Sequence, residues 1–273
     1  MRVLATLIFF ALLATASAKN PEPAHGLQTY VTSFSSVDGF AVNSEELLQL
    51  VQKLREKHGK SGNNAAFVGY LFDKTRHRFL RNYAEYATFS ETINKGTYNC
   101  LTGTALYALL LEHFDIPYQV IETNYHIFLV AETENGRVLL EATDRQNGVL
   151  LGESKIEARI KEYRQGLPSK SDHSKTYYQY EADVYRQVTL DELTGLLYYN
   201  RAIVAYNQHD LPAAIDRLIK SSERYQSPRT LEFAAILQIT VAASDLSASL
   251  KQEYLRKIQR LRASAVTLSA RRQ

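Results

Sequence analysis

Apolar residues recur at every third or fourth position in several long stretches of this sequence. This spacing places them along one side of an α-helix, which can then pack against a core. The pattern predicts helices over residues 43–59, 65–89 and 101–114, and further helices from residue 190 onward. Pro117 limits the third helix, because proline cannot continue one. The polar stretch 90–99 predicts a loop, and the stretch 19–41, with its prolines and glycines, predicts a linker.

Three shorter apolar runs follow Pro117 and are bounded by turn residues. They predict strands over residues 118–123, 127–133 and 138–142. Glu134-Asn135-Gly136 indicates a hairpin turn between the last two, and a three-residue loop would pair Thr133 with Arg137. Residues 153–188 predict a helix, an exposed loop and a short strand. The chain therefore belongs to the α+β class, with a helix packed on an antiparallel sheet and a helical region after it.

The helical region at the C-terminal end has a pattern of its own. Residues 196–202 and 213–218 flank a turn at His209-Asp210 and resemble the two helices of one tetratricopeptide repeat. A single repeat cannot bury its own faces, so it must pack on neighbouring helices. The region is either a groove that holds a peptide or protein partner, or a cap that stabilises the core. Its last helix is basic, which is typical of a solvated face or of contact with an anionic surface.

The N-terminal residues have the features of a secretory signal. Arg2 is followed by an apolar run over residues 3–15 and by the small residues Ala16-Ser17-Ala18, which suit signal peptidase. The run is too short to span a bilayer comfortably. We expect an exported protein, periplasmic or extracellular, whose mature chain begins near Lys19 and has no transmembrane segment.

Composition and charge narrow the classes of function. The net charge is only +3, so strong electrostatic attraction to nucleic acid is not indicated. The seven histidines do not show the spacing of metal ligands. No glycine-rich phosphate-binding loop is present. The sequence therefore predicts neither a metal nor an organic cofactor.

Cys100 is the only cysteine of the chain, so it has no disulfide partner within the chain. An unpaired cysteine in an exported protein suggests a reactive thiol. Cys100 precedes an apolar helix, where the helix dipole favours a thiolate, and His126 begins a predicted strand. An imidazole close to a thiol can accept its proton. A third group should orient the imidazole, and the uncertain strand register leaves both Glu141 and Asp144 as candidates.

These residues resemble the transglutaminase-like superfamily. The resemblance rests on the segment before Cys100, on the Asp115-Ile116-Pro117 turn, on the histidine strand 125–130 and on residues 139–143. It implies a papain-like core with Cys100 as nucleophile and His126 as base. It places Glu141 at the position of the family's usual aspartate, and Asp144 remains in reserve.

This chain departs from the family pattern at three places, where Glu141 replaces aspartate, Ala142 replaces proline, and Ile127-Phe128 replaces the frequent Ala-Trp pair. By the same resemblance, Asn94 occupies the place of an oxyanion-hole amide. The resemblance also implies catalysis without a metal or organic cofactor.

Two hypotheses follow. In the first, residues 1–18 are a signal peptide, residues 19–188 a transglutaminase-like thiol domain and residues 189–273 a tetratricopeptide-like helical region. The enzyme would cleave or transfer amide acyl groups of extracytoplasmic peptides or proteins, cell-wall peptides included. In the second, the same core is a non-catalytic scaffold, and the helical region binds a protein partner.

Overall fold

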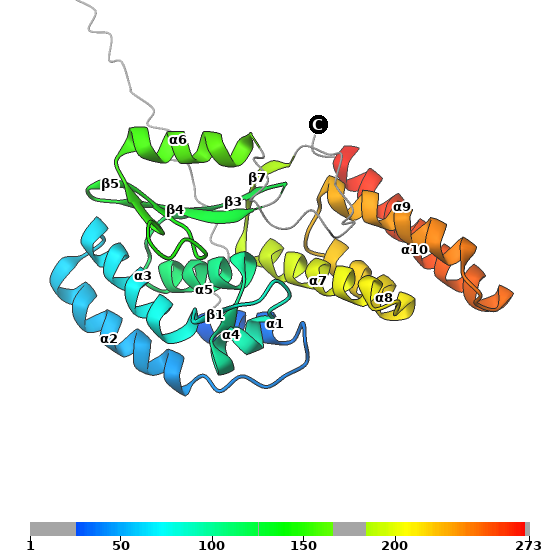
Figure 1. The fold of residues 1–273 in the computed structure, drawn as a ribbon, viewed down its shortest axis with the longest axis horizontal. Helices are drawn as coiled ribbons and strands as arrows, with labels where there is room; N and C mark the ends of the chain where they lie inside the picture. Colours follow the sequence, from blue (N-terminus) through cyan, green and yellow to red (C-terminus); the bar gives the residue numbers. More distant parts are fainter. Residues whose placement is uncertain (1–25, 125, 166–183, 271–273) are drawn as a thin grey trace, which may run out of the picture.

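A five-stranded antiparallel sheet lies at the centre of the protein (Figure 1). In this computed structural model, residues 26–124, 126–165 and 184–270 are described, with side chains through residue 263. The strand order is β6-β5-β4-β3-β7. The strands are β3 (Tyr118–Thr123), β4 (Ile127–Thr133), β5 (Gly136–Leu140), β6 (Val149–Leu151) and β7 (Tyr185–Val188). This mixture of helices and an antiparallel sheet agrees with the predicted α+β class.

The two faces of the sheet are covered by different helices, because side chains alternate along each strand. Ile127 and Leu129 of β4 face the main core, where α5 (Cys100–His113) packs. Phe128 and Val130 face the opposite way and form a smaller cluster with α6 (Glu153–Arg164). Figure 1 shows α6 and α5 on opposite sides of the sheet.

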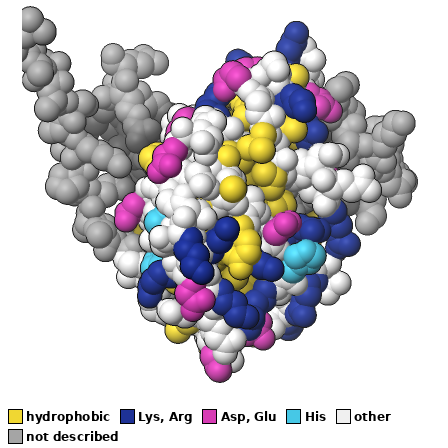
Figure 2. All heavy atoms as spheres, turned by 90° about the vertical axis from the view of Figure 1, so that its left-hand side faces the viewer, with side chains coloured by type: hydrophobic (Ala, Val, Ile, Leu, Met, Phe, Trp, Pro, Cys, Tyr) yellow, Lys and Arg dark blue, Asp and Glu magenta, His cyan; other side chains and the backbone are white. Residues whose placement is uncertain are grey.

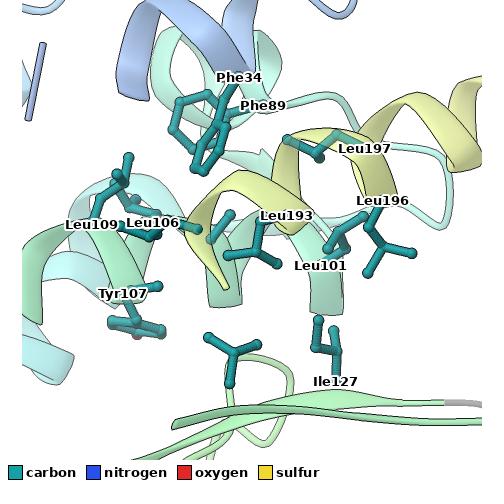
Figure 3. Packing of buried hydrophobic residues seen from close by; sticks show 14 of the residues in the cluster. Phe34, Phe89, Leu101, Leu106, Tyr107, Leu109, Ile127, Leu193, Leu196 and Leu197 are labelled. Atoms are coloured by element: carbon teal, nitrogen blue, oxygen red, sulfur yellow. The ribbon is translucent and has the colours of Figure 1, made fainter. Parts of the chain in front are cut away.

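Helix α5 is enclosed on all sides, and every residue from Leu101 to Leu111 is buried. The sheet lies on one side of it, while α1 (Leu27–Ser35), α4 (Phe89–Lys95) and α7 (Leu190–Asn207) pack on its other sides (Figure 3). Phe34 of α1 meets Phe89 of α4 edge to face, with ring centroids 5.1 Å apart. A helix held from several directions provides a fixed base for the residue at its N-terminus.

The segment before α5 differs from the sequence prediction. Helix α2 (Glu45–Ser61) is as expected, but α3 (Ala65–Phe79) ends ten residues earlier than predicted. The chain then forms β1 (Asn82–Tyr83), which pairs in parallel with β2 (Thr97–Tyr98). The backbone N–H of Asn82 donates to Gly96 O over 3.0 Å, a pairing that a continued helix would prevent.

Two predicted irregular segments contain helices. The predicted loop 90–99 includes α4, which begins with a reciprocal cap between Thr88 and Glu91. The predicted linker 19–41 includes α1, whose Val31 and Phe34 are buried in the core. The predicted signal peptide and most of the predicted exposed loop before β7 lie outside the described residues.

The hairpin between β4 and β5 has a shorter loop than the sequence suggested. Thr133 pairs with Gly136, not with Arg137. Gly136 has a φ of 104°, a conformation that glycine adopts without strain, and it therefore closes the turn itself. The register of β5 against β4 therefore differs by one residue from the one that a three-residue loop would give.

The C-terminal part is helical as predicted, with α7, α8 (Leu211–Ser222), α9 (Pro228–Ala243) and α10 (Ala248–Ala270). The turn between α7 and α8 falls at His209, which has a φ of 62°, and Asp210 caps α8. A Cβ atom at Gly195 would lie 2.5 Å from Cβ of Tyr225, so this glycine permits α7 to approach the end of α8 closely. Among the described residues, no helix has the length and apolar character needed to cross a membrane.

The face of the molecule near α2 and α3 carries hydrophobic side chains bordered by lysine and arginine (Figure 2). Lys57 and Lys74 both lie over the ring of Tyr70, at 5.9 and 5.2 Å from its centroid. Acidic side chains are interspersed, and Arg78 pairs with Glu46 at 3.2 Å. The charges on these helices are thus mixed in sign, in keeping with the small net charge.

Candidate active site

Cys100 is the first residue of α5, and its side chain is partly exposed. The buried side chain of Asn99 caps the helix by accepting a hydrogen bond from the backbone N–H of Thr102 over 2.9 Å. The amide of Asn99 also donates to the carbonyl oxygens of Glu85 and Ala87. The sulfur therefore stands at a rigid helix N-terminus, where the helix dipole favours negative charge.

A second hydrogen bond below the cysteine links α5 to α4. The hydroxyl of Thr92 donates to the hydroxyl of Thr102 over 2.9 Å, and both side chains are buried. Thr102 in turn accepts from the backbone N–H of Asn99. The sequence reasoning missed this support, although the Thr88-x-x-Glu91 capping signal for α4 was present in the sequence.

His126 lies immediately before β4 and is held by a turn from the end of β3. The backbone N–H of Thr123 donates to His126 O over 2.8 Å, and His126 N–H donates to the Thr123 hydroxyl over 3.1 Å. The imidazole lies close enough to Cys100 for the thiol to help raise its pKa. His126 and Cys100 are thus brought together from the start of β4 and the start of α5.

Glu141 follows β5 and binds the far side of the imidazole. Its Oε2 is hydrogen-bonded to His126 Nε2, and its Oε1 accepts from both the N–H and the hydroxyl of Thr143, over 2.8 and 2.6 Å. The side chain of Glu141 is 2% exposed and that of His126 is 19% exposed. Because Nε2 faces the carboxylate, Nδ1 is the ring nitrogen left for the sulfur. Cys100, His126 and Glu141 thus lie in series, with the imidazole between the thiol and the carboxylate.

The electrostatics follow from this series. Burial lowers the pKa of His126, but its hydrogen bonds to Cys100 and Glu141 and the charge of Glu141 outweigh burial and raise this pKa to about 10. Burial also raises the pKa of Glu141, yet the bonds from His126 and Thr143 outweigh it and hold this pKa below its ordinary value. The site therefore stabilises an imidazolium between two acidic groups.

Asp144, the other predicted acid, is used elsewhere. Its Oδ1 accepts from the backbone N–H groups of Gln146 and Asn147, over 3.1 and 2.8 Å, and its Oδ2 pairs with Arg159 at 3.3 Å. It closes the turn between β5 and β6. Asn94 is also engaged away from the sulfur: its amide donates to Ala41 O, and it accepts from a backbone N–H of the same segment. The side chain of Asn94 thus ties α4 to the segment before α2, and its suggested oxyanion-hole position stays a prediction.

Tyr163 of α6 covers the pair formed by His126 and Glu141. Its hydroxyl donates to Glu141 Oε2 over 3.2 Å, and its ring centroid lies 4.8 Å from that of His126. Arg159, one helical turn earlier, reaches the same hydroxyl at 3.3 Å. Nothing in the sequence pattern distinguished Tyr163 from other half-buried tyrosines, because its role depends on where α6 crosses the sheet.

A close contact between Gly103 and Ala142 sets the distance from α5 to the Glu141 segment. A Cβ atom at position 103 would lie 2.7 Å from Cβ of Ala142. Real Cβ atoms do not approach so closely, so only glycine lets the helix pack at this depth. Tyr83 of β1, 57% exposed, also lies near the sulfur. Burial raises the pKa of Tyr83, and the electrostatic effect of the neighbouring Cys100 adds to the rise.

Comparisons with known proteins do not assign the chain to a family. No protein-family model, no curated protein and no solved structure matches it. Within the described residues, no group of three or more His, Cys, Asp or Glu side chains is placed to hold a metal ion. The functional interpretation therefore depends on the arrangement of Cys100, His126 and Glu141.

Proposed function

We propose that this protein is an exported cysteine enzyme of the transglutaminase-like type, which cleaves or transfers amide acyl groups of peptides or proteins. The observation that carries the proposal is the arrangement of Cys100 at the N-terminus of α5, beside the imidazole of His126, which is itself hydrogen-bonded to Glu141. The packing of α5 on the strand that carries the histidine supports a papain-like core.

The residues have distinct roles in the proposed reaction. The sulfur of Cys100, with its proton held by His126, attacks the amide carbonyl and forms a tetrahedral intermediate. The backbone N–H of Cys100 has no acceptor within the helix, because the first N–H groups of a helix never do, and it stabilises the oxyanion. His126 then gives its proton to the leaving amine as the C–N bond breaks, and a thioester remains.

The second half of the reaction releases the thioester. Water or an amine gives a proton to His126 and attacks the thioester carbonyl, and the C–S bond breaks. Glu141 stays ionised throughout and orients the imidazole, as a third triad member does. The exposed Tyr83 is placed to contact the substrate beside the sulfur.

The test is alkylation of folded protein by iodoacetamide, followed by intact mass across a range of pH. The chain has one cysteine, so the label reports on Cys100 alone. We expect rapid labelling at about pH 6, where an ordinary thiol with a pKa of ~8.5 is almost wholly protonated, and we expect this labelling to be lost in His126→Ala. His113→Ala, at the other end of α5, is the matched control and should label like the wild type.

Two outcomes decide between the hypotheses. Rapid labelling that depends on His126 supports the enzyme and justifies a search for amide substrates. If the alkylation rate follows the titration of an ordinary thiol and is the same in His126→Ala, the enzyme hypothesis is contradicted. That result favours a non-catalytic scaffold. Export is tested separately by N-terminal sequencing of the secreted protein, which we expect to begin near Lys19.

A further inference from the structure

A buried polar cluster joins the helical C-terminal region to the strand that precedes His126. Glu122 of β3 is 1% exposed, and its Oε1 accepts from the hydroxyl of Tyr225 over 2.6 Å. Arg229, at the start of α9, pairs with the same oxygen at 3.2 Å. The cluster lies against the sheet and is contributed by two segments far apart in the sequence.

The same arginine also reaches the turn that holds the histidine. Its Nη2 donates to the carbonyl oxygen of Thr123 over 2.5 Å. Thr123 is the residue whose N–H and hydroxyl bind the backbone of His126. One guanidinium group therefore contacts both the buried Glu122 of β3 and Thr123, which fixes the backbone of the histidine.

The cluster of Glu122, Tyr225 and Arg229 is better suited to fixing the position of β3 than to stabilising the fold. Burial raises the pKa of Glu122 despite the nearby charge of Arg229 and the hydrogen bond from Tyr225. Its second oxygen, Oε2, is buried and has no hydrogen-bond partner among the described residues. Buried ion pairs commonly contribute little net stability, since both charges lose their hydration. The geometry that the pair imposes therefore explains its presence better than its contribution to stability does.

We propose that Arg229 is a positioning residue for His126, so that the corner between α8 and α9 (residues 223–229) is part of the support of the thiol site. The helical region then acts on the histidine from the same side of the sheet as α5, through Glu122 and Thr123. The catalytic consequence of this inference rests on the proposed function. The effect of Arg229 on the orientation of His126 does not.

The experiment uses the full chain and the double variant Glu122→Gln/Arg229→Met, which removes both buried charges together and so leaves neither charge alone. The first readout is the titration of the His126 imidazole by NMR. The second is the pH dependence of iodoacetamide alkylation at Cys100. Arg229→Lys keeps the charge but loses the two-pronged contact. Arg224→Met is the matched control, because Arg224 lies in the same corner and pairs only with the exposed Asp191 in the contacts described.

We expect the double variant to unfold cooperatively, to titrate His126 well below the value of about 10 in the wild type, and to be alkylated about 10- to 100-fold more slowly near pH 6. For Arg229→Lys, both the pKa of His126 and the alkylation rate should lie between those of the wild type and the double variant. For Arg224→Met, both should equal the wild-type values. If the double variant folds and both readouts equal those of the wild type, the inference is overturned.

If the proposed enzyme function is wrong but the inference about Arg229 is right, the two readouts give a different combination of results. In that case His126 still changes its titration in the double variant, while Cys100 of the wild type labels as an ordinary thiol. If the double variant does not fold, Arg229→Lys and Tyr225→Phe provide the same test, since each removes only part of the cluster. A wild-type titration of His126 in both of these variants would then overturn the inference.

Discussion

Replacement of Glu141 by glutamine removes the charge that faces His126 and keeps the shape of the side chain. Breaking a buried ion pair from one side costs about 3–5 kcal/mol. The cost here falls at the lower end, because His126 can lose its proton and the partly exposed imidazole then carries no unpaired charge. We therefore expect Glu141→Gln to lower the free energy of unfolding by about 3 kcal/mol at pH 7.

The effect depends on pH with a definite sign. The pKa of His126 is about 10 in the folded protein and about 6.5 in the unfolded chain. A group with a raised pKa contributes stability that is complete below the unfolded value and is lost as the pH rises through the folded value. The stability difference between wild type and Glu141→Gln should therefore shrink between pH 7 and 10, by at most about 1.4 kcal/mol per pH unit.

Urea unfolding, followed by circular dichroism at several pH values between about 7 and 10, measures this difference. Glu157→Gln is the matched control, since Glu157 is an exposed carboxylate that pairs with Arg137. Its effect should stay below about 1 kcal/mol. A difference for Glu141→Gln that stays constant or grows toward pH 10 would refute the imidazolium–carboxylate pair.

Two further variants test the packing around the site. Gly103→Ala should cost about 1–3 kcal/mol of unfolding free energy and slow alkylation of Cys100, because its new Cβ would lie 2.7 Å from that of Ala142 and displace α5. Gly69→Ala in α3 is the control, because a Cβ atom there meets no other atom within 4 Å. We expect this substitution to raise the melting temperature. Equal effects of the two substitutions on stability would contradict the packing argument. Tyr163→Phe removes the hydroxyl bonded to Glu141, so the titration of His126 by NMR should move downward by less than in Glu141→Gln; an unchanged titration would show that the hydroxyl plays no part.

The sequence predicted the central elements well where the pattern was long and strong. The apolar stretch after Cys100 and the strands around His126 lie where periodicity and turn residues indicated. Helix α4 was missed because it is short and polar, although its cap at Thr88 and Glu91 was visible. Helix α1 was missed because nearby prolines and glycines suggested a linker, and the spacing of Val31 and Phe34 was too brief to outweigh them.

The site could be predicted only in part, for a physical reason. The order of helix, strand and hairpin places Cys100, His126 and an acidic residue near one another, but the choice of acid depends on the loop length of one hairpin. The conformation of Gly136 shortens that loop, and local sequence does not determine it uniquely. The supports from Tyr163 and Arg229 come from elements whose positions depend on tertiary packing, so periodicity contains no information about them.

The position of β7 in the sheet affects the order in which parts of the protein can fold during synthesis. β7 pairs with β3, yet it is formed by residues 185–188, and Arg229 follows still later in the chain. A ribosome releases Cys100, His126 and Glu141 long before it releases the segments that support His126. An N-terminal fragment that stops before β7 leaves an unpaired edge at β3, next to the turn that holds the histidine. The supports of His126 are therefore complete only after residues well beyond Glu141 have been synthesised and have folded against β3.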